Sequence, residues 1–133
     1  MIGLDTNVLV RYIAQDDARQ SAQAGRLIEA LSIDEPGYVS MVALAELVWV
    51  LDDVYAMSRD ELYGVVERLL EADAMVVQSA PLVWLALRDF RSSSAGLADH
   101  LIHRAGSAAG CTDTLTFDRK AARSAGMKLV STP

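Results

Sequence analysis

Short apolar runs alternate along the chain with longer stretches in which apolar residues recur at helical spacing. Short apolar runs predict strands over residues 1–5, 37–40, 74–79, 113–117 and 127–131. Longer stretches between them predict helices over residues 6–14, 17–32, 41–55, 81–90, 97–110 and 118–126, and one more that opens at Ser58. The pattern therefore predicts strands and helices in alternation from one end of the chain to the other.

Local signals mark where several of these helices begin. Ser40 stands at the cap position of the helix over 41–55, and Ser58 with Glu61 has the spacing of a capping box. Pro81 opens the helix over 81–90, where a missing amide proton does no harm. These three helix starts are thus encoded within a few residues of sequence.

Alternating strands and helices predict an α/β fold. We expect one domain over residues 1–133, an α/β/α sandwich around a central, mostly parallel sheet of about five strands. Ligands of such sheets bind beyond the carboxyl ends of the strands. The residues that follow each strand are therefore the first place to look for chemistry.

Four carboxylates lie near these strand ends or in the first turns of the following helices: Asp5, Glu46, Asp99 and Asp118. Three have a structural alternative. Asp5 and Asp118 stand where a helix cap is needed, and Asp99 would complement a helix dipole.

Glu46 is harder to explain structurally, because residues 41–51 hold no other polar side chain. Such a helix is apolar on every face, so we expect it to be largely buried. A buried carboxylate requires a cation, which is either a metal ion or an arginine. Asp5 likewise lies in an apolar stretch, residues 1–10.

Four converging carboxylates would repel one another unless a divalent cation held them. Oxygen ligands favour Mg²⁺ or Mn²⁺, either of which can activate water for attack on a phosphodiester. No Ser/His/Asp set, Cys/His pair or phosphate-binding glycine loop offers a competing chemistry.

Four segments with these acids resemble one known family: IGLDTNVLVRY, SMVALAELVWVL, GLADHLIHRAGSAAGC and TLTFDRKAAR. Over its whole length the sequence resembles PIN domains, and more narrowly the VapC-type toxins of type II toxin–antitoxin pairs. The resemblance places the family's metal-binding acids on Asp5, Glu46, Asp99 and Asp118. It places the family's supporting hydroxyl on Thr116, and Thr6 and Asn7 follow the first acid as is usual.

The resemblance implies a Mg²⁺- or Mn²⁺-dependent endoribonuclease in which activated water cleaves RNA and the 3′-oxygen leaves. It also implies a homodimer, inhibited by a small cognate antitoxin. The alternatives are a PIN-like module that only binds protein and a haloacid-dehalogenase-like phosphatase. That phosphatase requires a second Asp where this chain has Asn7, and a receiver domain requires an acceptor Asp that residues 76–79 lack.

Charge and composition change this picture little. A net charge of −6 opposes nucleic-acid binding at first sight, but the four candidate ligands contribute much of it. The single Cys111, the absence of a signal peptide and the absence of a long apolar run predict a cytoplasmic protein without a membrane span.

Several other residues are weighed against structural roles. His100 and His103 suit a metal site or a general base, but we expect surface or supporting positions. Trp49 and Trp84 are expected in the core or a dimer interface. Asp113 is interpreted as a turn or strand-start residue, with an auxiliary acid as the alternative. Six basic residues flank the later acids, and we expect them to contact phosphates only if they cluster near the site. These residues are Arg88, Arg91, Arg104, Arg119, Lys120 and Arg123.

Overall fold

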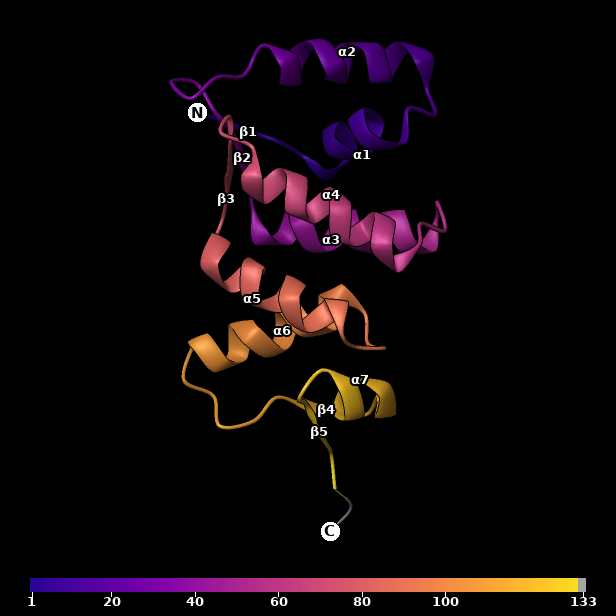
Figure 1. Ribbon diagram of the computed structural model, residues 1–133, viewed down its shortest axis with the longest axis vertical. Coiled ribbons are helices and arrows are strands. Elements are labelled where there is room, and N and C mark those ends of the chain that lie inside the picture. The colour runs from indigo at the N-terminus through magenta and orange to yellow at the C-terminus, as the bar shows by residue number, and fades with distance from the viewer. Residues whose placement is uncertain (132–133) are drawn as a thin grey trace. The chain divides into compact units, whose positions relative to one another are not determined.

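The computed structural model describes residues 1–131, and its backbone forms two compact units (Figure 1). The first unit comprises Met1–Ala80, and the second begins at Pro81. Within the described residues, no helix combines the length and the apolar character needed to cross a membrane.

A parallel three-stranded sheet runs through the first unit, in the order β1 (Ile2–Gly3), β2 (Gly37–Val39) and β3 (Met75–Val77). Ile2 pairs with Gly37, which in turn pairs with Met75, so the three strands start in register. Space is tight at Gly37: a Cβ atom would lie 2.8 Å from Leu4 Cδ1 and 2.9 Å from Leu31 Cδ1, so a larger residue would force these side chains to shift. Since all three strands are parallel, Asp5, Ser40 and Gln78 follow them at the same edge.

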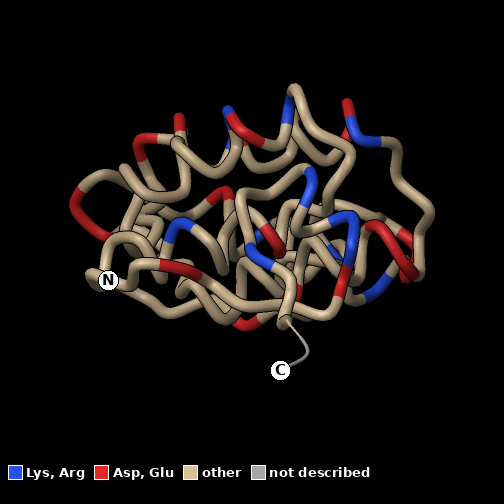
Figure 2. The backbone as a smooth tube through the Cα atoms, turned by 90° about the horizontal axis from the view of Figure 1, so that it is seen from below, with Lys and Arg blue, Asp and Glu red and all other residues tan. Residues whose placement is uncertain are grey.

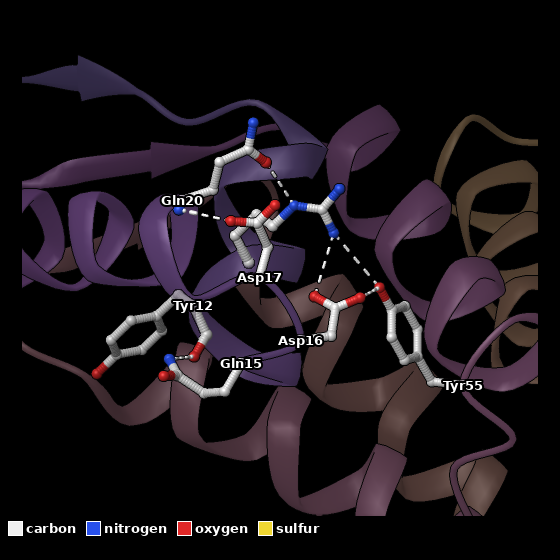
Figure 3. Close-up of polar contacts among 7 residues, drawn as sticks. Tyr12, Gln15, Asp16, Asp17, Gln20 and Tyr55 are labelled. Atoms are coloured by element: carbon white, nitrogen blue, oxygen red, sulfur yellow. Dashed lines mark hydrogen bonds and ion pairs between the residues drawn. The ribbon is translucent and has the colours of Figure 1, made fainter.

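Helices α1 (Thr6–Ala14) and α2 (Ala18–Glu29) pack against each other after a sharp corner. α1 ends at Gln15, whose left-handed backbone lets its N–H donate to Arg11 O, and Asp17 caps α2 by accepting from Gln20 N at 2.9 Å. Figure 3 shows Asp16 accepting a hydrogen bond from the Tyr55 hydroxyl beside this corner.

Helices α3 (Met41–Asp53) and α4 (Arg59–Glu71) begin where the local signals predicted. Ser40 Oγ accepts from Ala43 N at 3.1 Å. Ser58 and Glu61 form both bonds of the capping box, and these bonds lower the pKa of Glu61. α1 and α4 both contact α3, which supplies much of the first unit's core through Leu44, Leu47 and Leu51.

The second unit contains α5 (Ala80–Arg91), α6 (Leu97–Ala108), β4 (Leu115–Thr116), α7 (Arg119–Ser124) and β5 (Lys128–Leu129). β4 and β5 pair in parallel, with Thr116 opposite Leu129. Ala95, just before α6, packs with Ala121, Ala125 and Met127. A small apolar cluster therefore joins the residue before α6 to α7 and to the segment that follows α7.

The α/β prediction and the parallel strands are confirmed, but the strand number of the central sheet is wrong. The main sheet has three strands, and β4 and β5 form a separate two-stranded sheet. An apolar run indicates that a strand forms, whereas its partner is chosen by hydrogen bonds between distant segments. Runs that shorten to two residues, as β1, β4 and β5 do, carry little information about pairing.

Candidate metal-binding site

Asp5 follows β1 and occupies the N-cap position of α1, with an extended backbone (φ −77°, ψ 156°). Its side chain forms no capping hydrogen bond. The carboxylate is exposed, although Leu4 and Thr6 on either side are buried. Capping therefore does not account for an acid at this position, and the apolar neighbourhood did not bury it.

Glu46 is exposed, so the prediction of a buried carboxylate on a largely buried helix is wrong. α3 buries one stripe, made of residues 43, 44, 47, 48 and 51. The opposite face carries Glu46 between Val42, which is 70% exposed, and Trp49, which is 59% exposed. Both faces of α3 are apolar in sequence, so composition alone could not tell which face the core would cover.

The first two acids belong to neighbouring segments of the first unit. The hydroxyl of buried Thr6 donates to Glu46 Oε1 at 3.4 Å, which is long for a hydrogen bond between oxygens. This contact links the residue after Asp5 to α3, and the rest of the Glu46 carboxylate remains available.

The other two acids belong to the second unit. Asp99 lies in the first turn of α6, three residues after the N-cap Gly96. Asp118 caps α7, because its Oδ1 accepts from Lys120 N at 2.8 Å and from Ala121 N at 3.3 Å. Thr116 Oγ1 accepts from Asp118 N at 3.0 Å and so fixes the backbone that carries this acid. The structural alternative for Asp118 is realised, and its Oδ2 takes no part in the cap.

The supporting residues named from the sequence have different surroundings. Asn7 is exposed on α1 and lines a recess of about 290 Å³ together with Val8, Arg11 and Ala24. Asp113 is exposed in the loop before β4, so its interpretation as a turn or strand-start residue and the alternative of an auxiliary acid both stay predictions.

The four carboxylates have the chemistry that a hard divalent cation requires. All are oxygen donors, and among residues 1–131 no ion pair engages any of them. In the same part of the chain, no three side chains of His, Cys, Asp or Glu lie close enough together to hold a metal ion. Their chemistry suits a hard divalent cation, but the structure brings no three of them together: Asp5 and Glu46 belong to the first unit, and Asp99 and Asp118 to the second.

Comparison with known families gives the decisive observation. The PIN domain family matches residues 2–127, which is nearly the whole chain. The chain belongs to the PIN domain family. PIN domains are generally metal-dependent nucleases, and all four acids fall within the matched region. No curated protein matches the sequence significantly.

Surface or supporting positions were expected for the histidines of this PIN domain. His100 is buried, with 2% of its surface exposed, and its Nε2 lies 2.8 Å from Ser93 Oγ. His103 is partly buried, and its Nδ1 has no hydrogen-bond partner. A surface position is therefore wrong for His100, which serves as a polar core residue of the second unit.

The tryptophans were expected in the core or in a dimer interface. Trp49 and Trp84 are 59% and 38% exposed, so neither is a core residue, and a role in a dimer interface stays a prediction.

One of the candidate phosphate-binding cations is already engaged. Arg104 binds Asp89 with both ends of its guanidinium, Nε to Oδ2 at 2.6 Å and Nη2 to Oδ1 at 3.0 Å. This hydrogen bonding lowers the pKa of Asp89 and raises that of Arg104.

Phe117, which no sequence expectation included, stands between Thr116 and Asp118 and is 86% exposed. The available signal was the motif TLTFD, in which an aromatic residue directly precedes a candidate ligand.

Proposed function

We propose that this PIN domain is a Mg²⁺- or Mn²⁺-dependent endoribonuclease and the toxin of a type II toxin–antitoxin pair. The observation that carries the proposal is the family match over residues 2–127, which includes all four acids. The exposed, uncapped carboxylate of Asp5 supports it, because an acid without a structural task is available as a ligand.

In this proposal Asp5, Glu46, Asp99 and Asp118 would hold the metal. A bound divalent ion supplies an activated water and neutralises charge on the phosphodiester. Thr6 orients Glu46, and Thr116 fixes the backbone of Asp118. Asn7, exposed one residue further along α1, is a supporting polar contact for substrate or metal-bound water.

A second candidate is a PIN-like module that binds protein without cleaving RNA. It is favoured by the absence, within residues 1–131, of any group of three potential metal ligands. The exposed apolar residues Val42 and Trp49 beside Glu46 would suit protein contacts. The same four acids argue against it, because a purely protein-binding module has no need of them.

Cleavage of labelled RNA in the presence and absence of metal distinguishes the two. We expect cleavage with Mg²⁺ or Mn²⁺, complete loss in chelator, and full recovery when the metal is returned. Asp99→Asn, purified in the same way, serves as the control for contaminating nuclease and should be inactive. Undiminished cleavage in chelator would rule out the metal mechanism, and no cleavage with either metal would favour the protein-binding module.

A further inference from the structure

Phe117 is an apolar ring placed almost entirely in solvent, with 86% of its surface exposed. A single exposed apolar side chain is ordinary and by itself indicates nothing. Here the ring stands between Thr116 and Asp118, directly beside a candidate metal ligand. A substrate bound at Asp118 would therefore pass close to this residue.

The backbone on both sides of Phe117 is hydrogen-bonded. Thr116 O accepts from Val130 N at 2.9 Å across the β4–β5 pair. On the other side, Asp118 N donates to Thr116 Oγ1, and the Asp118 carboxylate caps α7. A ring mounted on such a backbone loses little conformational freedom when it binds a ligand, which favours affinity.

The segment that follows Asp118 has the opposite charge to the chain as a whole. The chain carries a net charge of −6, yet residues 119–131 contain four basic residues and no Asp or Glu. All four are exposed, and none forms an ion pair within the described residues. They are Arg119, Lys120, Arg123 and Lys128. The reverse holds over residues 27–58, which contain six acidic residues and no Lys or Arg. Figure 2 marks the charged positions along the backbone.

We propose that Phe117 and the basic side chains of α7 form a contact surface for single-stranded RNA. One base stacks on the Phe117 ring, and neighbouring phosphates contact Arg119, Lys120 and Arg123. An aromatic ring beside cationic side chains complements a chain of bases and phosphates, and the position next to Asp118 keeps that RNA close to a candidate ligand. This inference rests on the proposed ribonuclease function and names the residues with which the enzyme holds its substrate.

Binding is measured separately from cleavage, by fluorescence anisotropy of a labelled 20-nucleotide RNA of mixed sequence in chelator. Phe117→Ala should weaken binding about tenfold, and Phe117→Leu should recover little, because stacking requires the aromatic face. Ile33→Ala is the matched control, since Ile33 is also exposed, at 72%, but lies in the first unit. Unchanged melting temperatures would show that the Phe117 variants are folded.

The charge component is tested with paired arginine variants. Arg119→Ala/Arg123→Ala should reduce the slope of log affinity against log salt by roughly 1.4, since each phosphate contact on a single strand contributes ~0.7. Arg19→Ala/Arg26→Ala removes the same charge from exposed positions of α2 and should leave this slope unchanged.

Wild-type affinity in Phe117→Ala, or equal losses in both arginine pairs, would overturn the inference. If Phe117→Ala leaves RNA binding intact but weakens a protein complex, the surface is a protein contact and the inference is also wrong. Failure of the ribonuclease proposal has a different signature: no metal-dependent cleavage by the wild type, whatever the variants bind.

Discussion

The hydroxyl of Thr6 donates to the carboxylate of Glu46 across 3.4 Å, although the two residues are forty positions apart in the sequence. Packing of α1 against α3 creates this contact, and it places the acid of α3 beside the segment that carries Asp5. Because the hydroxyl carries no charge, this contact can orient the Glu46 side chain and leaves its negative charge in place. Thr6 is therefore a positioning residue for the first pair of proposed ligands.

Thr6→Val should test this role. The substitution keeps the shape of a buried side chain and removes its donor, so we expect little change in melting temperature. The Mg²⁺ concentration for half-maximal cleavage should rise about tenfold. Loss of a group that orients a metal ligand typically weakens metal binding by about 10- to 100-fold, and this contact is long. Thr6→Ser, which keeps the hydroxyl, is the control, and an unchanged metal requirement in Thr6→Val would contradict the role.

Asp5 and Asp118 should respond differently to substitution. Asp5→Asn should abolish cleavage and leave the melting temperature in metal-free buffer unchanged, because the side chain makes no capping bond. Asp118→Ala should abolish cleavage and also cost about 1 kcal/mol of stability, because it removes the cap of α7. Asp118→Asn keeps a side chain that can cap α7, so it should lose activity without losing stability. Early unfolding of Asp5→Asn would show that Asp5 is structural after all.

The proposed antitoxin should combine an apolar and a basic contact. Two recesses of about 290 and 260 Å³ adjoin α1 and α2, and the second is lined by apolar residues such as Ile13, Ile28 and Leu69. We expect a helix of the antitoxin to occupy this region and to insert an Arg or Lys among the acids. Replacing that basic residue with alanine should weaken inhibition more at low salt than at high salt. If inhibition were weakened equally at every ionic strength, the four acids would take no direct part in binding the antitoxin.

The Asp89–Arg104 pair predicts an acid-sensitive contribution to stability. The hydrogen bonds from Arg104 lower the pKa of Asp89 in the folded state. The pair's contribution to stability is therefore complete above the ordinary aspartate pKa of 3.8 and is lost as the pH falls below it. The pair is partly exposed and bidentate, so we expect about 1 kcal/mol or less at neutral pH, or roughly 3 °C in melting temperature. Asp89→Asn should lose this increment at pH 7 and differ little from the wild type near pH 2. If Asp89→Asn were equally less stable than the wild type at pH 7 and at pH 2, the lost stability would come from packing and not from the ion pair.

Helix starts were predictable because each depends on a few adjacent residues. Ser40, Ser58 and Glu61 cap their helices as the sequence indicated, since a capping bond spans only three positions. The candidate acids were likewise visible as carboxylates near strand ends. The family match covers every one of them.

Burial and strand pairing depended on contacts between distant segments. Apolar composition determined that α3 would be a helix, but packing against α1 and α4 decided that Glu46 would face solvent. Five strands were encoded locally, whereas their division into sheets of three and two was decided by which backbones met. Asp5 and Asp118 look alike in sequence, and only the folded backbone gave a capping bond to one and left the other free. The sequence by itself thus determined which elements and which acids this protein has, because those depend on neighbouring residues. The tertiary structure decided which acids face solvent and which already serve as caps, because that depends on contacts that no local pattern specifies.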